Sequence, residues 1–534
     1  MSNRLSPSAR MSPARRRILK GGVAAGALVL PLGAGSLAFP AISRASARPV
    51  ITHGLQSGDV TAEGGMIWAR SDRPSRLLVE VATSDSFADA RTLAPIDAVP
   101  SRDFAVKRLL SGLPADQEIF YRVRFASLDD PRATSEAMVG RFRTAPSERR
   151  SVRFAWSGDT AGQGWGIDAG RGGMGTYETM RRHAPDFFIH SGDTIYADGP
   201  IAERAEMPDG GTWNNLVAEG VHKVAESLEE FRGRWKYNLL DEHVRAFNAE
   251  VPTFFQWDDH EVVNNWSTAK DLTADDRYTE KSVMTLAARA GTAFHEMTPI
   301  RYTPEEPGRV YRKLSYGPLL DVFFLDLRSY RGPNGDGMQN VIDEKSRVLG
   351  AAQLDWLKRG LSASSATWKV IASDMPLGLI VWDDFAMQAG VEAVSNGDGG
   401  KPAGRELEFA ELLRHIRDEG IDNMVWLTAD VHYTAAHHYS PDRATFQEFE
   451  PFWEFVSGPL HSGSFGPNGL DPTFGPEVRF VKAPPEGEVN LPPSAGLQFF
   501  GLVDIDGDSE RLTVRLMDRG DSELYSVTLD PRSA

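Results

Sequence analysis

Short runs of apolar residues, rich in aromatic and β-branched side chains, recur from residue 152 onward, and each stops at a polar loop. This composition and length are typical of buried strands. Four of the runs have an aspartate directly or shortly beyond their last residue; they span residues 154–157, 187–190, 253–257 and 424–428. Because ligands of open α/β sheets bind beyond the carboxyl ends of strands, we expect the polar residues after these runs to meet in one site.

Stretches with helical periodicity separate the runs. The predicted helices cover residues 177–183, 228–247, 282–294, 351–361 and 406–418. Further strands are predicted at 320–325, 368–372 and 453–456, and a closing β-meander at 497–505, 512–516 and 524–529. This alternation predicts an α/β architecture in which helices pack on layered sheets.

Residues 50–144 have a different pattern, that of a small β-sandwich. Strand-like segments at 65–70 and 77–82 are separated by a proline-containing turn. The corner at 112–114 and the strand at 119–125 resemble a fibronectin type III domain, with Phe120 where that domain has its corner tyrosine. Nothing in this segment suggests catalysis, so we expect a packing or shielding module.

The first 47 residues read as a targeting segment. Arg15, Arg16 and Arg17 precede Ile18 and Leu19 in a twin-arginine layout, an Ala/Gly/Leu-rich run covers 21–39, and residues 45–47 offer a small-residue cleavage site. A single membrane anchor is the alternative, but glycine and proline interrupt the apolar run, so no permanent anchor is expected. We therefore predict export in the folded state by the twin-arginine translocase, to a periplasmic or secreted location.

Composition and charge narrow the partners and the chemistry. With 534 residues, 41% hydrophobic and 25% charged, the chain is long enough for several domains and a large core. It has no cysteine, so neither disulfides nor thiolate ligands are available. The formal net charge is -16. Because the first 47 residues are basic, the net charge of the rest of the chain is still more negative. A surface of this kind disfavours a stable nucleic-acid partner.

The residues beyond the four runs form two sets of potential metal ligands. Asp159, Asp193, Tyr196 and His432 combine oxygen and nitrogen donors with one phenolate, a hard donor that suits Fe(III). A second set, nearly all oxygen, favours Ca²⁺ or another hard divalent ion such as Mg²⁺ or Mn²⁺. It consists of Asp259 and Asp430, with Asp193 as a possible bridge. Two such ions suit phosphoester cleavage, because one activates a hydroxide while both hold phosphoryl oxygens.

Other polar residues surround these sets. We expect His260 to act as general acid or charge stabiliser beside the leaving oxygen, with Glu261 fixing its tautomer. For Arg328 two alternatives stay open, a clamp on the substrate phosphate and a salt bridge at the edge of the core. His437 and His438 are placed in a loop after a late strand, where solvent exposure is the favoured interpretation.

The order of these motifs resembles a known family. The motifs run in the order Gly-Asp, Gly-Asp-x-x-Tyr, a histidine flanked by acidic residues, and a final x-x-x-His. This order is similar to that of the calcineurin-like metallophosphoesterases, whose purple acid phosphatase branch includes the tyrosine. The segments 257–261, 325–331 and 429–432 resemble the alkaline phosphatase D family in particular, and the likeness extends over nearly the whole chain.

This resemblance implies a fold, an activity and a set of ligands. The fold is a layered α/β/β/α sandwich behind an N-terminal fibronectin III-like domain, with boundaries expected at 1–47, 48–146 and 147–534. The activity is that of an exported phosphomonoesterase or phosphodiesterase with Fe(III) and Ca²⁺. Carried over motif by motif, His260 is catalytic and the metal ligands are Asp159, Asp193, Tyr196, Asp259, Asp430 and His432.

Two departures from the family pattern shape the expectation. Asp159 stands where the family often has a cysteine ligand, and Asp430 stands where it has a histidine. We expect Asp159 to replace the cysteine, as in purple acid phosphatases and in a branch similar to iron-dependent bacterial phospholipase D. A phospholipase D-type diesterase acting on a phospholipid substrate, and a catalytically dead secreted binding protein, are the alternative functions.

Overall fold

The computed structural model describes residues 48–532. The predicted twin-arginine leader, residues 1–47, lies outside the described residues. Among the helices of the described part, none combines the length and the apolar character needed to cross a bilayer.

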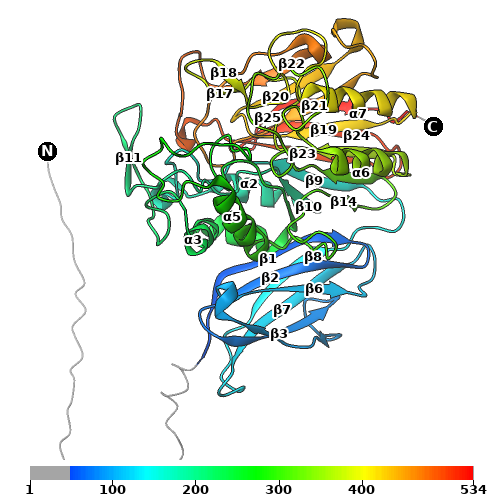
Figure 1. The fold of residues 1–534 in the computed structure, drawn as a ribbon. Coiled ribbons are helices and arrows are strands. Elements are labelled where there is room, and N and C mark those ends of the chain that lie inside the picture. The colour runs from blue at the N-terminus through cyan, green and yellow to red at the C-terminus, as the bar shows by residue number, and fades with distance from the viewer. Residues whose placement is uncertain (1–47, 533–534) are drawn as a thin grey trace, which may run out of the picture. The chain divides into compact units, whose positions relative to one another are not determined.

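Two large sheets form the centre of the fold (Figure 1). The first has the strand order β13-β10-β9-β23-β24-β25 and the second β14-β15-β16-β19-β21-β20-β22. Neighbouring strands run parallel from β13 to β9 and from β15 to β21. The strands of the first sheet are β9 (Val152–Ser157), β10 (Phe187–His190), β13 (Thr253–Phe255), β23 (Phe499–Ile505), β24 (Leu512–Asp518) and β25 (Glu523–Leu529). Those of the second are β14 (Arg312–Ser315), β15 (Leu320–Phe324), β16 (Trp368–Ala372), β19 (Met424–Thr428), β20 (Thr434–Tyr439), β21 (Phe452–Val456) and β22 (Pro476–Lys482).

The sheets pack face to face, and helices cover both outer faces. Alternation along β10 sends Phe187 and Ile189 into the core between the sheets, while Phe188 faces the helices of the first sheet. These helices are α2 (Gly175–Arg182), α3 (Leu228–Asn238), α4 (Glu242–Glu250) and α5 (Val283–Met297). Helices α6 (Ala351–Ser362) and α7 (Glu406–Asp418) cover the second sheet. The predicted layered α/β/β/α sandwich is thereby confirmed.

An N-terminal β-sandwich precedes these layers. One of its sheets pairs β1 (Ile51–Thr61), β2 (Gly64–Ser71) and β6 (Ala105–Ser111); the other pairs β3 (Ser75–Ala82), β4 (Arg91–Thr92), β5 (Ile96–Ala98), β7 (Glu118–Ser127) and β8 (Met138–Arg143). On β7 the side chain of Tyr121 is fully buried in the core, whereas that of Phe120 is only partly buried. Two short hairpins, β11 (Arg204–Glu206) with β12 (Thr212–Asn214) and β17 (Trp382–Asp384) with β18 (Ala389–Val391), belong to loops of the layered part.

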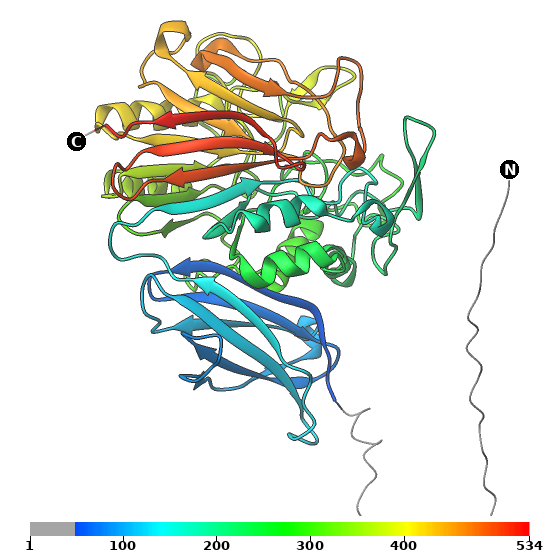
Figure 2. The same cartoon turned by 180° about the vertical axis from the view of Figure 1, so that it is seen from behind.

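The sandwich lies against the layers on the side of their helices (Figure 2), and buried polar contacts join the two parts. Asp59 of β1 pairs with Arg312 at 2.7 Å and also accepts a hydrogen bond from the backbone N–H of Arg301. The indole N–H of Trp68 donates to the carbonyl of Glu296 at 2.8 Å. The sandwich and the layers therefore form one packed body.

The helix predicted over residues 228–247 is wrong, because the segment forms two helices, α3 and α4. Asp241 caps the second one: its Oδ1 accepts from the N–H groups of His243 and Val244. The apolar residues Leu239 and Leu240 continue the helical pattern across the break, so periodicity alone did not reveal it.

Candidate metal centre

The carboxyl ends of strands from both sheets converge on one buried cluster of acidic and histidine side chains. Asp159 follows β9, Asp193 follows β10, Asp258 and Asp259 follow β13, and Asp430 follows β19. Three groups within the described residues have ligand atoms within 4.8 Å of one another: Asp159, Asp193 and His432; Asp193, Asp259 and His260; and Asp258, Asp259 and Asp430. The predicted ligands are thus brought together, and Asp193 belongs to two groups.

The first group contains the mixed donors. The Asp159 carboxylate lies 3.4 Å from Nε2 of His432, and the Tyr196 hydroxyl lies 2.8 Å from the same nitrogen. His432 Nδ1 contacts the carbonyl of Gly463, an arrangement that leaves Nε2 with a free electron pair. Burial lowers the pKa of His432 to about 4, so the ring is neutral at ordinary pH. A neutral imidazole and a carboxylate directed at one point are suited to bind a metal ion.

The second group is made almost entirely of oxygen. Asp258, whose role the sequence left open, joins Asp259 and Asp430 there, while Asp259 is shared with the group that contains His260. Asp193 is therefore placed between the two predicted sets, as a bridge would be.

Several buried carboxylate oxygens of the cluster have no hydrogen-bond partner. Both oxygens of Asp159 are orphaned, as are Asp258 Oδ2 and Asp259 Oδ1. Burial, followed by the nearby carboxylates, raises the pKa of Asp159 and of Asp193 well above the usual range. Unpaired buried carboxylates are costly, and bound cations are what would offset them. The residues present fit a metal centre.

The backbone at the cluster is strained. Asp159, Asp193, Asp430 and His432 have φ values of 67°, 50°, 69° and 56°. These lie in the left-handed region, which non-glycine residues adopt uncommonly and which is concentrated at functional sites. All four residues belong to the groups of potential ligands described above.

His260 is oriented by a residue that the sequence did not reveal. Its Nδ1 lies 2.8 Å from Oδ1 of Asp198, whose Oδ2 accepts from the N–H of Asn264. Burial lowers the pKa of His260, but the Asp198 and Asp259 carboxylates outweigh it and raise the pKa to about 9. Asp198 lies two residues beyond Tyr196, and its place in the same loop was the one available signal.

The predicted role of Glu261 as the partner of His260 is wrong. Its carboxylate accepts hydrogen bonds from the backbone N–H groups of Asp193, Thr194 and Asp258. Glu261 therefore holds the backbone of the two loops that carry the candidate ligands Asp193 and Asp258.

Comparison with known proteins agrees with this geometry. The model of the PhoD-like phosphatase family matches residues 154–516, and that of the PhoD-like phosphatase N-terminal domain matches residues 36–146. The chain belongs to the PhoD-like phosphatase family. It is 27% identical over 486 residues to alkaline phosphatase D of Bacillus subtilis (strain 168), which covers 86% of this chain and 77% of that protein.

Two solved structures share the fold of this PhoD-like phosphatase. The structure of PhoD aligns with a TM-score of 0.64 at 19% identity and covers 90% of this chain and 88% of that one. Purple acid phosphatase PPD1 from yellow lupin seeds aligns with a TM-score of 0.54 at 12% identity, covering 90% and 74%. The predicted family, the fold class and the class of enzyme, a phosphoric ester hydrolase, are confirmed.

Arg328 of this PhoD-like phosphatase is fully buried behind the second group. Its Nε contacts Asp258 at 2.5 Å and lies 3.6 Å from Asp374, while Nη1 contacts Glu392. Nη2 has no hydrogen-bond partner and lies 4.0 Å from carboxylate oxygens of both Asp259 and Asp430. Of the two alternatives these contacts favour the salt bridge, and a direct role in catalysis stays a prediction.

The late histidines lie elsewhere. His437 and His438, predicted in a loop, belong to β20, which pairs with both β21 and β22. The His437 ring contacts Glu454 at 3.0 Å. Neither residue belongs to the three potential metal groups of the described chain.

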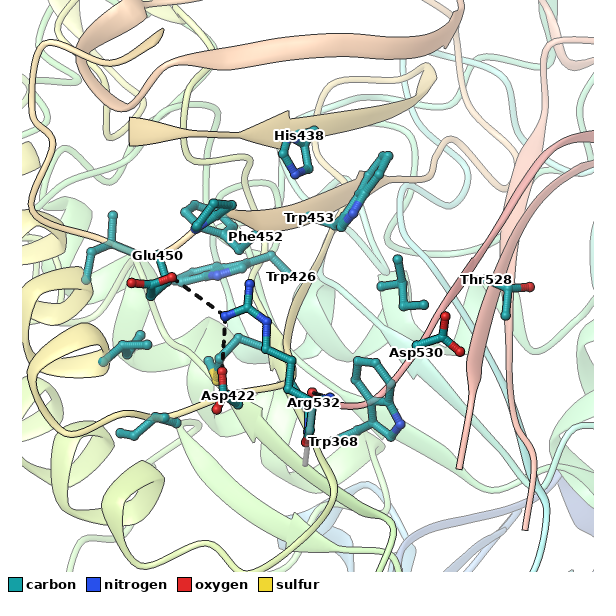
Figure 3. A pocket seen from close by; sticks show the side chains of 17 residues that line it. Trp368, Asp422, Trp426, His438, Glu450, Phe452, Trp453, Thr528, Asp530 and Arg532 are labelled. Atoms are coloured by element: carbon teal, nitrogen blue, oxygen red, sulfur yellow. Dashed lines mark hydrogen bonds and ion pairs between the residues drawn. The ribbon is translucent and has the colours of Figure 1, made fainter. Parts of the chain in front are cut away.

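A hollow of about 290 Å³ opens at the opposite edge of the second sheet (Figure 3). Trp368, Met424 and Phe452, the first residues of β16, β19 and β21, line it, so it lies at the amino ends of the strands. Within it Arg532 pairs with Asp422 at 3.2 Å and Glu450 at 3.6 Å. Arg532 is thus held between two acidic residues, and the hollow is separate from the metal centre.

Proposed function

We propose that this chain is an exported metal-dependent phosphoesterase that hydrolyses phosphate monoesters, diesters or both. The observation that carries the proposal is the buried cluster around Asp193, in which Asp159 and Asp259 have carboxylate oxygens without a hydrogen-bond partner. Bound cations would offset the cost of burying these oxygens, and two hard cations side by side are suited to phosphoryl transfer.

We assign Fe(III) to the group that contains Asp159, Asp193 and His432, together with Tyr196. Burial, followed by the Asp193 and Asp159 carboxylates, raises the pKa of Tyr196 well above its usual value. Its phenol therefore ionises only beside a strongly charged cation, which favours a trivalent ion. We assign Ca²⁺, or Mg²⁺ or Mn²⁺, to the group of Asp258, Asp259 and Asp430, whose donors are all oxygen. Ions bound there would polarise the phosphoryl group and activate water.

The chain's own residues supply the proton chemistry. His260 holds a proton beside Asp193 and Asp259, where it can pass the proton to the leaving oxygen or stabilise its charge. Asp198 keeps the ring in one orientation through Nδ1. Arg328 holds Asp258 in place and directs one free N–H group toward Asp259 and Asp430.

The leader and the charge of the chain bear on its location, its substrate and its partners. The leader supports export by the twin-arginine translocase to a periplasmic or secreted location, with no permanent anchor. The acidic charge supports a small phosphoester substrate without a stable nucleic-acid partner. A phospholipase D-type activity on a phospholipid is the variant of the same chemistry. A catalytically dead binding protein is disfavoured because Asp193, His260 and His432 are present and brought together.

Metal analysis combined with two chromogenic substrates tests the proposal. Purified holoprotein should contain iron and a hard divalent ion, show the visible absorption of a tyrosinate–Fe(III) centre, and hydrolyse p-nitrophenyl phosphate or bis(p-nitrophenyl) phosphate. Removing the metals with a chelator should abolish hydrolysis, and adding them back should restore it. Full activity in metal-free protein would refute the proposal, and a colourless active enzyme that contains zinc alone would refute the Fe(III) assignment.

A further inference from the structure

His190 lies directly behind the metal centre and has no part in the chemistry described so far. It is the last residue of β10, is 1% exposed, and stacks on Phe255 with ring centroids 5.9 Å apart. Alternation places it on the same face of the sheet as Phe188, toward the helices. It belongs to none of the potential metal groups of residues 48–532.

Both nitrogens of the ring contact threonine hydroxyls. Nε2 lies 3.1 Å from Oγ1 of Thr160, and Nδ1 lies 3.2 Å from Oγ1 of Thr194. Thr160 directly follows Asp159 in the chain, and Thr194 directly follows Asp193. A neutral imidazole has one donor and one acceptor nitrogen. It can therefore donate a hydrogen bond to one of the two threonine hydroxyls and accept one from the other. The ring therefore links the two loops that carry the ligands of the first group.

The two loops need such a link because both are strained. Asp159 and Asp193 have positive φ values, a conformation that surrounding contacts must enforce. The backbone supplies part of the restraint, since the N–H of Thr160 donates to the carbonyl of Asp193 at 2.8 Å and that of Asp159 to Gly192 at 3.3 Å. The imidazole bridge adds a side-chain restraint through the threonine that follows each aspartate.

We propose that His190 is a positioning residue that sets the distance between Asp159 and Asp193 by bridging Thr160 and Thr194. The inference rests on the proposed function, because it concerns the metal that these two carboxylates hold. Burial lowers the pKa of His190 to about 3, which is consistent with a permanently neutral bridge.

Binding of Mn²⁺ to metal-free protein tests the inference without reference to turnover. The electron paramagnetic resonance signal of free Mn²⁺ gives the number of sites and the Kd of each. The site that Asp159→Asn removes is the first group, whose carboxylate and imidazole donors also suit Mn²⁺, and its Kd is the one compared. His190→Ala should raise the Kd by about 10-fold, the range found for residues that orient metal ligands. With saturating metal, the kcat for p-nitrophenyl phosphate should fall while KM changes little.

Thr194→Val removes the contact with His190 Nδ1 without opening a cavity, so it keeps the test open if His190→Ala does not fold. Thr160→Val removes the contact with His190 Nε2 and also the 3.1 Å contact with the Tyr177 hydroxyl, so it is the less selective variant. Each should raise the Kd, and combining Thr194→Val with His190→Ala should add little, because both break one bridge. His437→Gln and Thr179→Val are matched controls at buried positions. His437 contacts Glu454, and the Thr179 hydroxyl donates to the carbonyl of Arg519. Both controls should keep the wild-type Kd.

The outcomes separate this inference from the proposed function. Wild-type protein that binds no Mn²⁺ would refute the metal centre itself. Wild-type protein that binds Mn²⁺, with unchanged Kd values in His190→Ala and Thr194→Val and only a loss of stability, would overturn the positioning role. Fully additive effects of the two substitutions would overturn the bridge.

Discussion

At the scale of single residues, the centre is governed by charged groups that are buried beside one another. Asp198 and Asp259 raise the pKa of His260, and the contact of His432 Nδ1 with the carbonyl of Gly463 places the proton on Nδ1 and leaves Nε2 unprotonated. In each case a neighbouring group, and not the residue type alone, decides the protonation state. The chemistry therefore depends on contacts between residues far apart in the sequence.

Asp198→Asn is expected to lower turnover by roughly 10–100-fold, because the His260 ring loses the carboxylate that orients and charges it. His260→Ala should cost more, roughly 10²–10⁴-fold. Metal content, measured by mass spectrometry of the elements, should stay near wild type in Asp198→Asn. Introduced into His260→Ala, Asp198→Asn should cause little further loss; a full additional loss, or loss of metal, would contradict the assigned role.

The convergence of the candidate ligands could be predicted from the sequence, but the contacts that orient them could not. Asp159, Asp193, Asp259 and Asp430 follow strand-like runs directly, so topology alone brings them to one edge. Asp198 lies 62 positions from His260 and meets it only through the path of a loop. Glu261 was assigned to His260 because it is adjacent in sequence, yet the loop points it at backbone amides.

At the scale of elements, strongly patterned segments were predicted well. Helix α7 and strands β16 and β19 have the predicted bounds, since each is a regular periodic run between clear stop signals. The break between α3 and α4 was missed because an N-cap residue, Asp241, starts a second helix inside a continuous apolar pattern. Capping is a local hydrogen-bonding event that periodicity does not register.

Asp241→Ala should lower the free energy of unfolding by about 1–2 kcal/mol, because it removes the cap of α4. The loss should be near the upper end, since Oδ2 of Asp241 also accepts from the N–H of Met174 at 3.0 Å. Urea denaturation followed by circular dichroism measures the change. Asp241→Asn, which keeps Oδ1 as an acceptor, should cost less; equal losses in the two variants would show that the cap is not the cause.

At the scale of the whole molecule, the N-terminal sandwich is joined to the catalytic layers by a buried ion pair. Asp59 is fully buried and pairs with Arg312, which also donates to the carbonyl of Phe255 at the end of β13. The sandwich was predicted as a packing module, and this contact indicates that it supports the strand that leads to Asp258 and Asp259.

Asp59→Ala should destabilise the protein by about 3–5 kcal/mol, because Arg312 is left buried without its counter-ion. Asp59→Ala combined with Arg312→Met should recover part of that loss. Asp97→Ala, which breaks an exposed pair with Arg76 in the same sandwich, is the control and should change the unfolding midpoint little. A single variant at Asp59 that unfolds like the Asp97 control would contradict this account.

The central claim is that one buried carboxylate, Asp193, serves both metal groups. The most direct measurement is the metal content per chain of Asp193→Asn, determined together with hydrolysis of p-nitrophenyl phosphate. Asp186→Asn is the matched control, because Asp186 precedes the same strand at its opposite end and contacts Arg150. We predict that Asp193→Asn loses metal from both groups and its activity, whereas Asp186→Asn retains both. A folded Asp193→Asn protein with wild-type metal content and activity would contradict the account.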